Sequence, residues 1–178
     1  MAGPARTVLG MWMLLAIGGC SSPPVASTRE ETDMQLTSSA FHDGGRIPTE
    51  HSCDGEDVSP PLAWSGAPEG TEAFVLVVED PDAGNFVHWL LTDIPGDTDD
   101  MPAGQGDRIG RPGRSSFGAA GWGGPCPPSG EHRYVFTLYA VSQPVAVGDG
   151  ASASDARQAM TGHILAEAQL SGRYAREG

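Results

Sequence analysis

Two short segments set titratable side chains, which could donate, accept or exchange a proton, beside residues that look like core. "EDPDAGNFVHWLL" (79–91) sets Asp80 and His88 among apolar residues, and "EHRYVFTLYAV" (131–141) does the same with His132 and Tyr134. Burying titratable groups costs free energy unless they find partners. A carboxylate can accept a hydrogen bond from a histidine and favour its cationic form. Together with the Tyr134 hydroxyl, these side chains could form the polar lining of a pocket.

Strand periodicity explains how residues so distant in sequence could meet. Apolar runs predict strands over 71–80, 86–95 and 132–141. Because successive side chains on a strand point to opposite faces, each strand carries its polar residues at one end of an otherwise apolar face. If those ends are adjacent, the four side chains line one pocket at the edge of the core, with "GGPCPP" (123–128) as its rim.

Ordinary structural roles are open for the same residues. His88 could be a core histidine that is satisfied by a backbone carbonyl. Asp80 and Asp82 flank Pro81 and could only stabilise a turn, because aspartate side chains bond nearby backbone amides. Tyr134 could pack in its strand with the hydroxyl in water.

The remaining chain predicts a single, loop-rich, mostly β domain. Its 25 glycines and 15 prolines are spread between apolar runs over 178 residues. A further strand is predicted over 34–41 and a last short one over 171–175. The one clear helix is predicted at about 154–169, with Ser154 able to cap its first turn. Residues 97–130 form a long Gly/Pro-rich region, and such loops are usually functional or disordered.

Composition and missing motifs exclude several classes of function. The net charge is −13 and all ten basic residues are arginines, so no basic patch for nucleic acid is visible. The sequence holds no zinc-ligand motif, no G-x-S-x-G and no phosphate-binding glycine loop. We therefore predict no metal and no cofactor, and the sequence carries no strong catalytic signature.

The N-terminus resembles that of an exported bacterial lipoprotein. Residues 1–19 carry only Arg6 as a charge and an apolar run too short to span a bilayer, as in a signal peptide. "IGGC" resembles a lipobox, which predicts that Cys20 is lipidated and becomes the mature N-terminus. The alternative is an ordinary signal peptide with an incidental cysteine.

This reading divides the chain and places it in the cell. Residues 20–32 are polar and contain Pro-Pro, so they predict a flexible tether to a domain over 33–178. Ser21 resembles the signal for outer-membrane sorting. The expected location is therefore the bacterial cell envelope, lipid-anchored to the outer membrane and facing the periplasm.

Two cysteines remain once Cys20 is lipidated. Cys53 and Cys126 could form a disulfide in an oxidising compartment. Pairing requires Cα atoms within about 7 Å of each other, which the sequence alone does not decide.

Two segments resemble the signatures of a known family. "EDPDAG" with "FVHWLLTDIPG", and "GGPCPPSGEHRYVFTLYAV", are similar to the phosphatidylethanolamine-binding protein (PEBP) family. The match is with its bacterial branch, the Raf kinase inhibitor-like proteins of the YbhB/YbcL type. The likeness covers about residues 34–176. Gly84, Ser115 and Trp122 depart from the usual pattern in the loops, which concerns ligand preference more than fold.

The resemblance implies a fold and a pocket. The fold would be an antiparallel Greek-key β-sandwich with a few peripheral helices. The pocket would bind anions such as phosphate, acetate or a phospholipid headgroup. By motif position, the pocket residues would be Asp80, His88, His132 and Tyr134, with Pro125 and Phe86 as rim or wall.

Three functions are compatible with these observations. The leading one is a membrane-tethered protein that binds a small anionic ligand. The second is an inhibitor or modulator of a protein target, a protease or a kinase, that contacts it through residues 97–130. The third is a weak hydrolase that uses His88 and Asp80.

Overall fold

Strands dominate the part of the chain that the computed structural model describes, which is residues 1, 3 and 33–176. The predicted anchor at Cys20 and the tether over 20–32 lie outside the described residues, as does nearly all of the signal peptide predicted over 1–19. Within the described part, no helix has the length and apolar character needed to cross a membrane.

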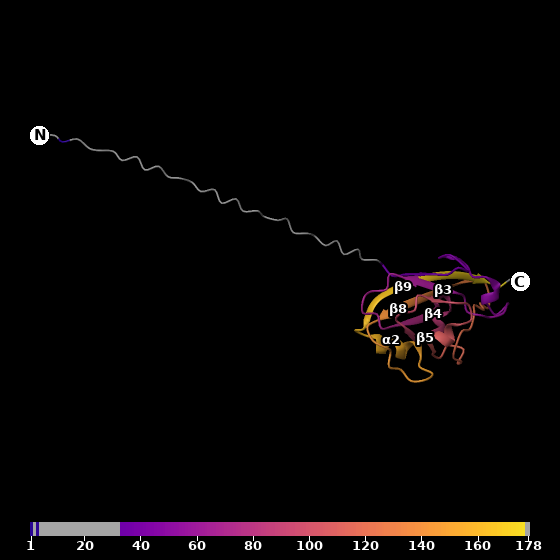
Figure 1. Cartoon of the computed structure of the whole chain (residues 1–178). Helices are drawn as coiled ribbons and strands as arrows, with labels where there is room; N and C mark the ends of the chain where they lie inside the picture. Colours follow the sequence, from indigo (N-terminus) through magenta and orange to yellow (C-terminus); the bar gives the residue numbers. More distant parts are fainter. Residues whose placement is uncertain (2, 4–32, 177–178) are drawn as a thin grey trace. The chain divides into compact units, whose positions relative to one another are not determined.

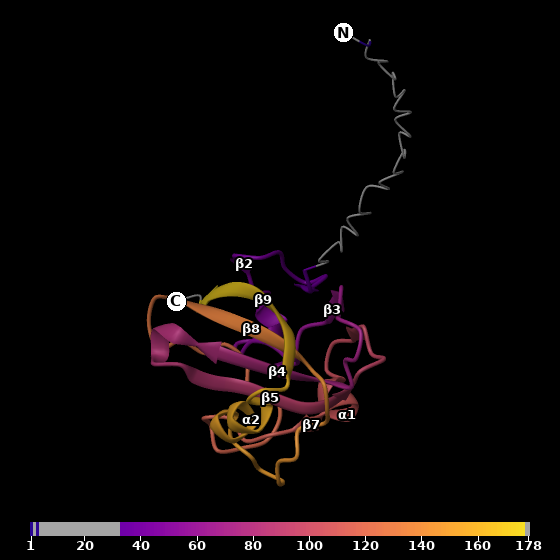
Figure 2. The same cartoon turned by 90° about the vertical axis from the view of Figure 1, so that its left-hand side faces the viewer.

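The strands form two sheets (Figures 1 and 2). The smaller sheet has the order β1-β3-β6 and the larger β2-β9-β8-β4-β5-β7. Their bounds are β1 Gln35–Thr37, β2 Gly45–Arg46, β3 Leu62–Ser65, β4 Ala73–Asp80, β5 Phe86–Pro95, β6 Asp100–Met101, β7 Arg111–Pro112, β8 Glu131–Val141 and β9 Ile164–Ala175. Neighbours are antiparallel except β2 and β9. Strands β4, β5 and β7 lie side by side in chain order, and β8 then returns to pair with β4, the first of them. The larger sheet therefore contains the expected Greek key.

Strand β4 lies at the centre of the molecule, with apolar side chains on both faces. Phe74, Leu76 and Val78 are fully buried in the core that the two sheets share. Val75 and Val77 point the other way and pack in a second cluster with the helix α2, Ala153–Met160. Figures 1 and 2 both show α2 against this outer face of the larger sheet. The apolar run of β4 predicts this central position, and the structure confirms it.

The predicted C-terminal helix is too long. Helix α2 ends at Met160, and its N-cap is Ser152, which forms a capping box with Asp155, rather than Ser154. From Ile164 the chain is the strand β9, which pairs with the whole length of β8. Alternate β9 side chains face inward, namely Ala168, Leu170, Gly172 and Tyr174. "LAEAQL" consists of helix-favouring residues, but pairing with β8 and this alternating burial override that preference.

The Gly/Pro-rich region over 97–130 is ordered. It contains β6, β7 and the short helix α1, Gly106–Ile109. The Trp89 indole donates a hydrogen bond to Asp107 Oδ1 over 2.9 Å, which holds α1 against β5. A Cβ at Gly106 would lie 2.3 Å from the Trp89 ring, so only glycine allows this approach. The region therefore packs on the larger sheet before it reaches the rim segment "GGPCPP".

Candidate functional site

A cavity of about 260 Å³ lies where β4, β5 and β8 meet, and we call it the Asp80 cavity. It collects the four side chains singled out in the sequence. Its lining consists of Asp80, Ala83, Phe86, His88, Phe117, Cys126, Pro127, Pro128, His132 and Tyr134. Three strand ends thus deliver an acid, two imidazoles and a phenol to one hollow.

A β-bulge aims His88 into this cavity. In the pairing of β4 with β5, Val78 lies opposite Trp89 but Glu79 lies opposite Val87, so His88 is an extra residue. Strict alternation would put His88 on the same face as Leu90. The structure instead packs Leu90 in the cluster beneath α2, while His88 lines the Asp80 cavity. Bulges re-aim side chains in this way and are common beside functional sites.

Asp80 is buried and uses its two oxygens differently. Oδ1 accepts a hydrogen bond from the Ala83 backbone N–H at 3.0 Å and caps the short 3-10 helix Pro81–Ala83. Oδ2 lies 2.7 Å from His132 Nδ1, which therefore carries the hydrogen. The turn role and the pocket role considered from the sequence are both present in one carboxylate. The neighbouring Asp82 accepts from the Arg133 backbone N–H at 2.8 Å and ties the same turn to β8.

His88 is a buried ring with one nitrogen bound to the backbone. Its Nδ1 lies 2.7 Å from the Gly123 carbonyl oxygen, so Nδ1 is the donor. In the neutral ring, Nε2 then has a free lone pair. Burial lowers the pKa of His88 below its ordinary value, although the Gly123 carbonyl and the negative charge of Asp80 oppose the shift. The ligand-free ring is therefore neutral at neutral pH, and the cationic form that we expected beside a carboxylate does not apply to it.

Tyr134 presents a buried polar group. The side chain is 1% exposed, and among the described residues its hydroxyl makes no hydrogen bond of good geometry, although the Asp80 carboxylate and the Cys126 backbone lie close enough to act on it. Burial, followed by the negative charge of Asp80, raises the pKa of the phenol well above its ordinary value. The hydroxyl therefore keeps its proton and can serve as a donor. The Tyr134 ring meets the edge of the His88 ring, with centroids 5.0 Å apart.

Aromatic rings form the other wall of the cavity. Phe86 lines it as the resemblance implies, and Phe117 is a wall residue that the sequence reasoning missed. The Phe117 ring contacts Phe86 and His88 edge-on, at centroid distances of 4.8 and 5.4 Å. Its only signal in the sequence was that it is the single aromatic residue in the Ser/Gly-rich stretch "GRSSFG" of a long loop, and loops often carry binding residues.

The rim is formed differently from the expectation. Pro125 is buried and is not among the residues that line the cavity, whereas Pro127 and Pro128 are. The Pro125 carbonyl instead accepts a hydrogen bond from the Cys53 backbone N–H over 3.2 Å. Side chains on a strand alternate between two faces, but a run of prolines in a loop shows no such alternation. The sequence therefore does not indicate which proline faces the cavity.

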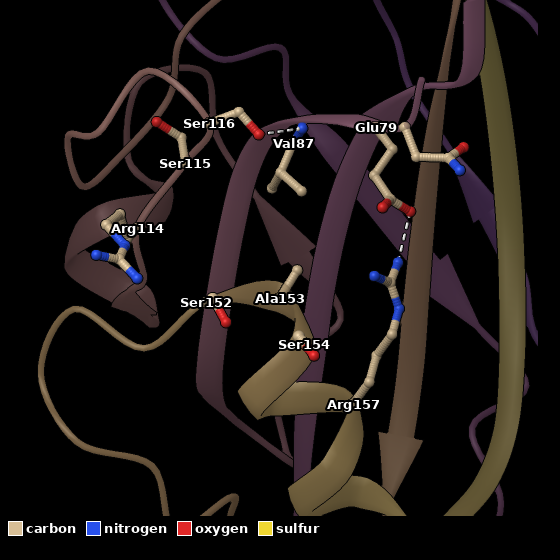
Figure 3. A pocket seen from close by; sticks show the side chains of 10 residues that line it. Glu79, Val87, Arg114, Ser115, Ser116, Ser152, Ala153, Ser154 and Arg157 are labelled. Atoms are coloured by element: carbon tan, nitrogen blue, oxygen red, sulfur yellow. Dashed lines mark hydrogen bonds and ion pairs between the residues drawn. The ribbon is translucent and has the colours of Figure 1, made fainter. Parts of the chain in front are cut away.

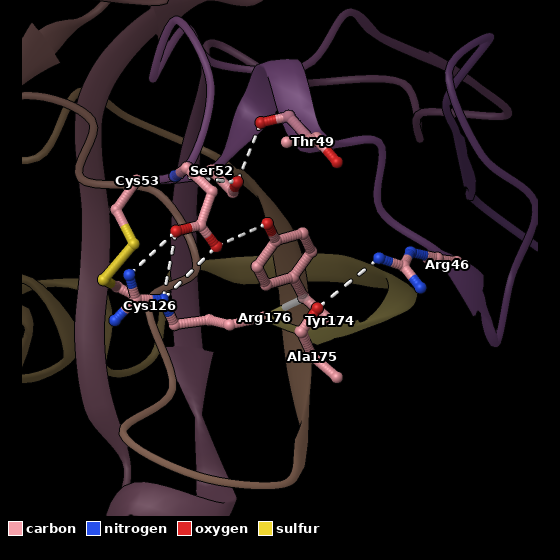
Figure 4. Close-up of polar contacts among 9 residues, drawn as sticks. Arg46, Thr49, Ser52, Cys53, Cys126, Tyr174, Ala175 and Arg176 are labelled. Carbon is pink, nitrogen blue, oxygen red and sulfur yellow. Dashed lines mark hydrogen bonds and ion pairs between the residues drawn. A yellow bond between two sulfur atoms is a disulfide. The ribbon is translucent and has the colours of Figure 1, made fainter. Parts of the chain in front are cut away.

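A disulfide attaches this rim to a distant segment (Figure 4). The Cys53 and Cys126 sulfurs are bonded, with Cα atoms 5.5 Å apart. Beside Cys53, Asp54 accepts hydrogen bonds from the Tyr174 hydroxyl and from the Arg176 guanidinium, at 2.8 and 3.0 Å. These bonds, Arg176 first, lower the pKa of Asp54. The rim is therefore held both by the disulfide and by the C-terminal end of β9.

A larger hollow of about 600 Å³, the Arg157 cavity, lies on the opposite face of β4 and β5 (Figure 3). Glu79 and Val87 line it, in alternation with Asp80 and Phe86, which face the other way. None of the four predicted side chains reaches it. Its Arg157 guanidinium forms an ion pair with Glu79, and Arg114 lines the same hollow.

Among the described residues, no group of three or more His, Cys, Asp or Glu side chains could hold a metal ion. The hydrolase hypothesis pairs His88 with Asp80, whereas the structure pairs Asp80 with His132. What the Asp80 cavity offers is a set of donors: the Tyr134 hydroxyl, and two imidazole Nε2 atoms that become donors on protonation.

The fold and this cavity define a class of β-sandwich protein with a small pocket at the strand ends, in which an acid, two imidazoles and a phenol meet apolar walls. The family model described as phosphatidylethanolamine-binding protein matches residues 37–175, and the chain belongs to this family. A UPF0098 protein of Methanothermobacter thermautotrophicus is 43% identical over 150 residues, covering 80% of this chain and 99% of that protein.

Two further comparisons agree on the family. The crystal structure of YbcL from E. coli, described as a new member of the mammalian PEBP family, has a TM-score of 0.75 and 31% sequence identity. It covers 82% of this chain and 99% of YbcL. A Mycobacterium tuberculosis protein named "Putative lipoprotein LppC" is 35% identical over 187 residues, covering 93% of this chain and 92% of that protein. The resemblance read from the signature segments is thereby confirmed.

Proposed function

We propose that the protein binds a small anionic group, of the phosphate or phospholipid-headgroup type, in the Asp80 cavity. One observation carries the proposal: the buried Tyr134 hydroxyl makes no hydrogen bond of good geometry among the described residues, and it lines a cavity that also holds two imidazoles. A buried donor without a partner costs about 1–3 kcal/mol. A ligand oxygen that accepts from this hydroxyl removes that cost.

The charges of the site favour an anion once it has entered. Asp80 already has His132 as its partner, so the acid does not face the ligand unpaired. An anion near the Nε2 atoms favours the protonated form of the imidazoles. Each charge-assisted hydrogen bond then contributes roughly 1.5–3 kcal/mol.

The size of the cavity indicates the size of the bound group. Its volume of about 260 Å³ is below the roughly 300–1,000 Å³ of pockets that enclose drug-sized ligands. A phosphate or a single headgroup fits that scale, whereas a whole diacyl lipid would have to keep its chains outside.

We also propose that the protein works from a membrane surface, with the lipid anchor at Cys20. The lipobox-like "IGGC" supports this, and so does the name of the Mycobacterium tuberculosis relative, which aligns with 93% of this chain. A tethered binding domain would sample ligands close to the membrane.

The test is titration calorimetry of the purified protein with inorganic phosphate. We expect His88→Ala to weaken phosphate binding about tenfold or more, a loss of about 1.4 kcal/mol, because one charge-assisted bond disappears. His163→Ala is the matched control, because His163 does not line the cavity, and its affinity should equal that of the unchanged protein. Equal affinities for all three proteins would contradict the proposal.

A further inference from the structure

Phe117 separates the Asp80 cavity from a second hollow. The second hollow, which we call the Trp122 cavity, measures about 290 Å³ and is lined mainly by residues 119–124. Phe117 and Cys126 line both cavities, so the two spaces adjoin across one aromatic ring and one disulfide.

The position of the Phe117 ring is specified by its neighbours. A Cβ at Gly123 would lie 2.6 Å from the ring, so the absence of a side chain there is what seats Phe117. The same Gly123 supplies the carbonyl that holds His88. Even so, Phe117 is 52% exposed, the most exposed large apolar side chain between residues 33 and 176. An exposed ring between two cavities would gain from contact with a ligand that passes it.

Apolar surface dominates the walls of both cavities, but the polar groups that they hold differ. Ala119, Ala120 and the disulfide give it a largely apolar wall. Its one carboxylate, Asp57, accepts a hydrogen bond from the Gly124 backbone N–H at 2.8 Å. Its lining holds no imidazole, so the groups that could bind an anion all lie on the Asp80 side of Phe117.

We infer that the ligand is a phosphate monoester with a compact apolar substituent, and that Phe117 determines which substituents fit. The phosphate occupies the Asp80 cavity, and the substituent passes the Phe117 ring into the Trp122 cavity. This inference rests on the proposed function, because it assigns the anionic part of the ligand to the same four residues. It adds the second half of the ligand and the residue that selects it.

Three probes of graded chemistry test the inference by calorimetry: inorganic phosphate, phosphoethanolamine and phenyl phosphate. We expect the unchanged protein to bind phenyl phosphate about tenfold more tightly than the other two, because only its ring gains from an apolar cavity. Phosphoethanolamine carries a charged substituent of similar size and so separates a lipid-headgroup preference from an apolar one.

Two variants complete the experiment. Ala119→Leu fills the Trp122 cavity and lies outside the Asp80 cavity, so it should abolish the phenyl preference and leave inorganic phosphate binding unchanged. Phe117→Ala removes the partition, so the preference, measured relative to inorganic phosphate, should shift to the larger 1-naphthyl phosphate.

The outcomes distinguish the two proposals. If inorganic phosphate binds but phenyl phosphate shows no preference in any of the proteins, the inference about Phe117 is wrong and the anion site stands. A preference for phosphoethanolamine over phenyl phosphate would likewise overturn the inference, in favour of a lipid headgroup. If no phosphate compound binds, the proposed function itself fails.

Discussion

Asp80 shows how one residue can serve both the fold and the site. Its Oδ1 holds the turn between β4 and β5, and its Oδ2 orients His132. Because the carboxylate is fixed by both bonds, the His132 ring is directed with little freedom. Asp82 adds a second tie between the same turn and β8. Of the three acids in "EDPDAG", Asp80 positions the His132 imidazole, Asp82 holds the turn, and Glu79 pairs with Arg157 on the other face.

At the same scale, removing the Tyr134 hydroxyl should affect stability and phosphate affinity in opposite directions. Tyr134→Phe removes a buried hydroxyl that makes no hydrogen bond of good geometry among the described residues. Without ligand, the variant should be as stable as the unchanged protein or up to about 1 kcal/mol more stable, because an unsatisfied donor is lost. With phosphate, its affinity should fall about tenfold.

Thermal unfolding in phosphate-free buffer and calorimetry with phosphate measure the two effects separately. A variant that is less stable without ligand, yet binds phosphate normally, would show that the hydroxyl has a structural role only. A variant that loses stability and affinity together would also contradict our account.

Among the elements, the strong strands could be predicted from sequence and the details that aim the side chains could not. The apolar run of residues 86–95 predicts β5 with its observed bounds. The bulge that turns His88 into the cavity depends on how β5 pairs with β4, and no pattern within β5 alone reveals it. The expected alternation of side chains along β5 led to the right cavity residues. However, it also assigned Leu90 to the cavity face, where the structure does not place it.

The same limit explains the error at the C-terminus. "ILAEAQL" offers apolar residues at helical spacing and also at alternate positions, and its alanines favour a helix. The choice is made by β8, whose long exposed edge accepts β9 as a partner. Local sequence patterns do not predict such pairing between segments that are distant in the chain.

The cavity residues that could not be predicted from the sequence lie in a loop. Phe117 and Pro127 reach the cavity from the segment 113–130, whose course depends on the disulfide and on the hydrogen bond from Gly124 to Asp57. The sequence leaves the pairing of Cys53 with Cys126 open, because pairing depends on the distance between the two residues in the folded chain. Without that link, the choice between Pro125 and its neighbours as rim residues could not be made.

At the scale of the whole molecule, family membership and the arrangement of the pocket support each other. The signature segments identify the family, and the structure brings their acid, imidazoles and phenol to one cavity of about 260 Å³. The net charge of −13 opposes the approach of anions, so in our proposal the donors of the cavity act at close range.

The proposed anchor gives a prediction for the whole chain in a bacterial cell. Cys20→Ser removes the thiol that would carry the lipid, so the protein should leave the membrane fraction and appear in the soluble fraction. Cell fractionation followed by immunoblotting measures this. Cys53→Ser is the control, since it removes a cysteine of the disulfide and should leave the protein in the membrane fraction. Equal membrane retention of the Cys20→Ser and unchanged proteins would rule the anchor out.

The central claim is that His88 and His132 become donors to a bound anion. The most direct measurement is nitrogen NMR of the histidine rings at neutral pH, with and without saturating phosphate. Without phosphate, His88 should be neutral, with hydrogen on Nδ1 only, because burial lowers its pKa. With phosphate, Nε2 of His88 should gain a hydrogen, and the signals of His88 and His132 should change at the same half-saturating concentration. His51, whose Nδ1 lies 3.0 Å from the Val58 carbonyl outside the cavity, should not change. Ring signals of His88 and His132 that stay fixed while phosphate is added would contradict the account.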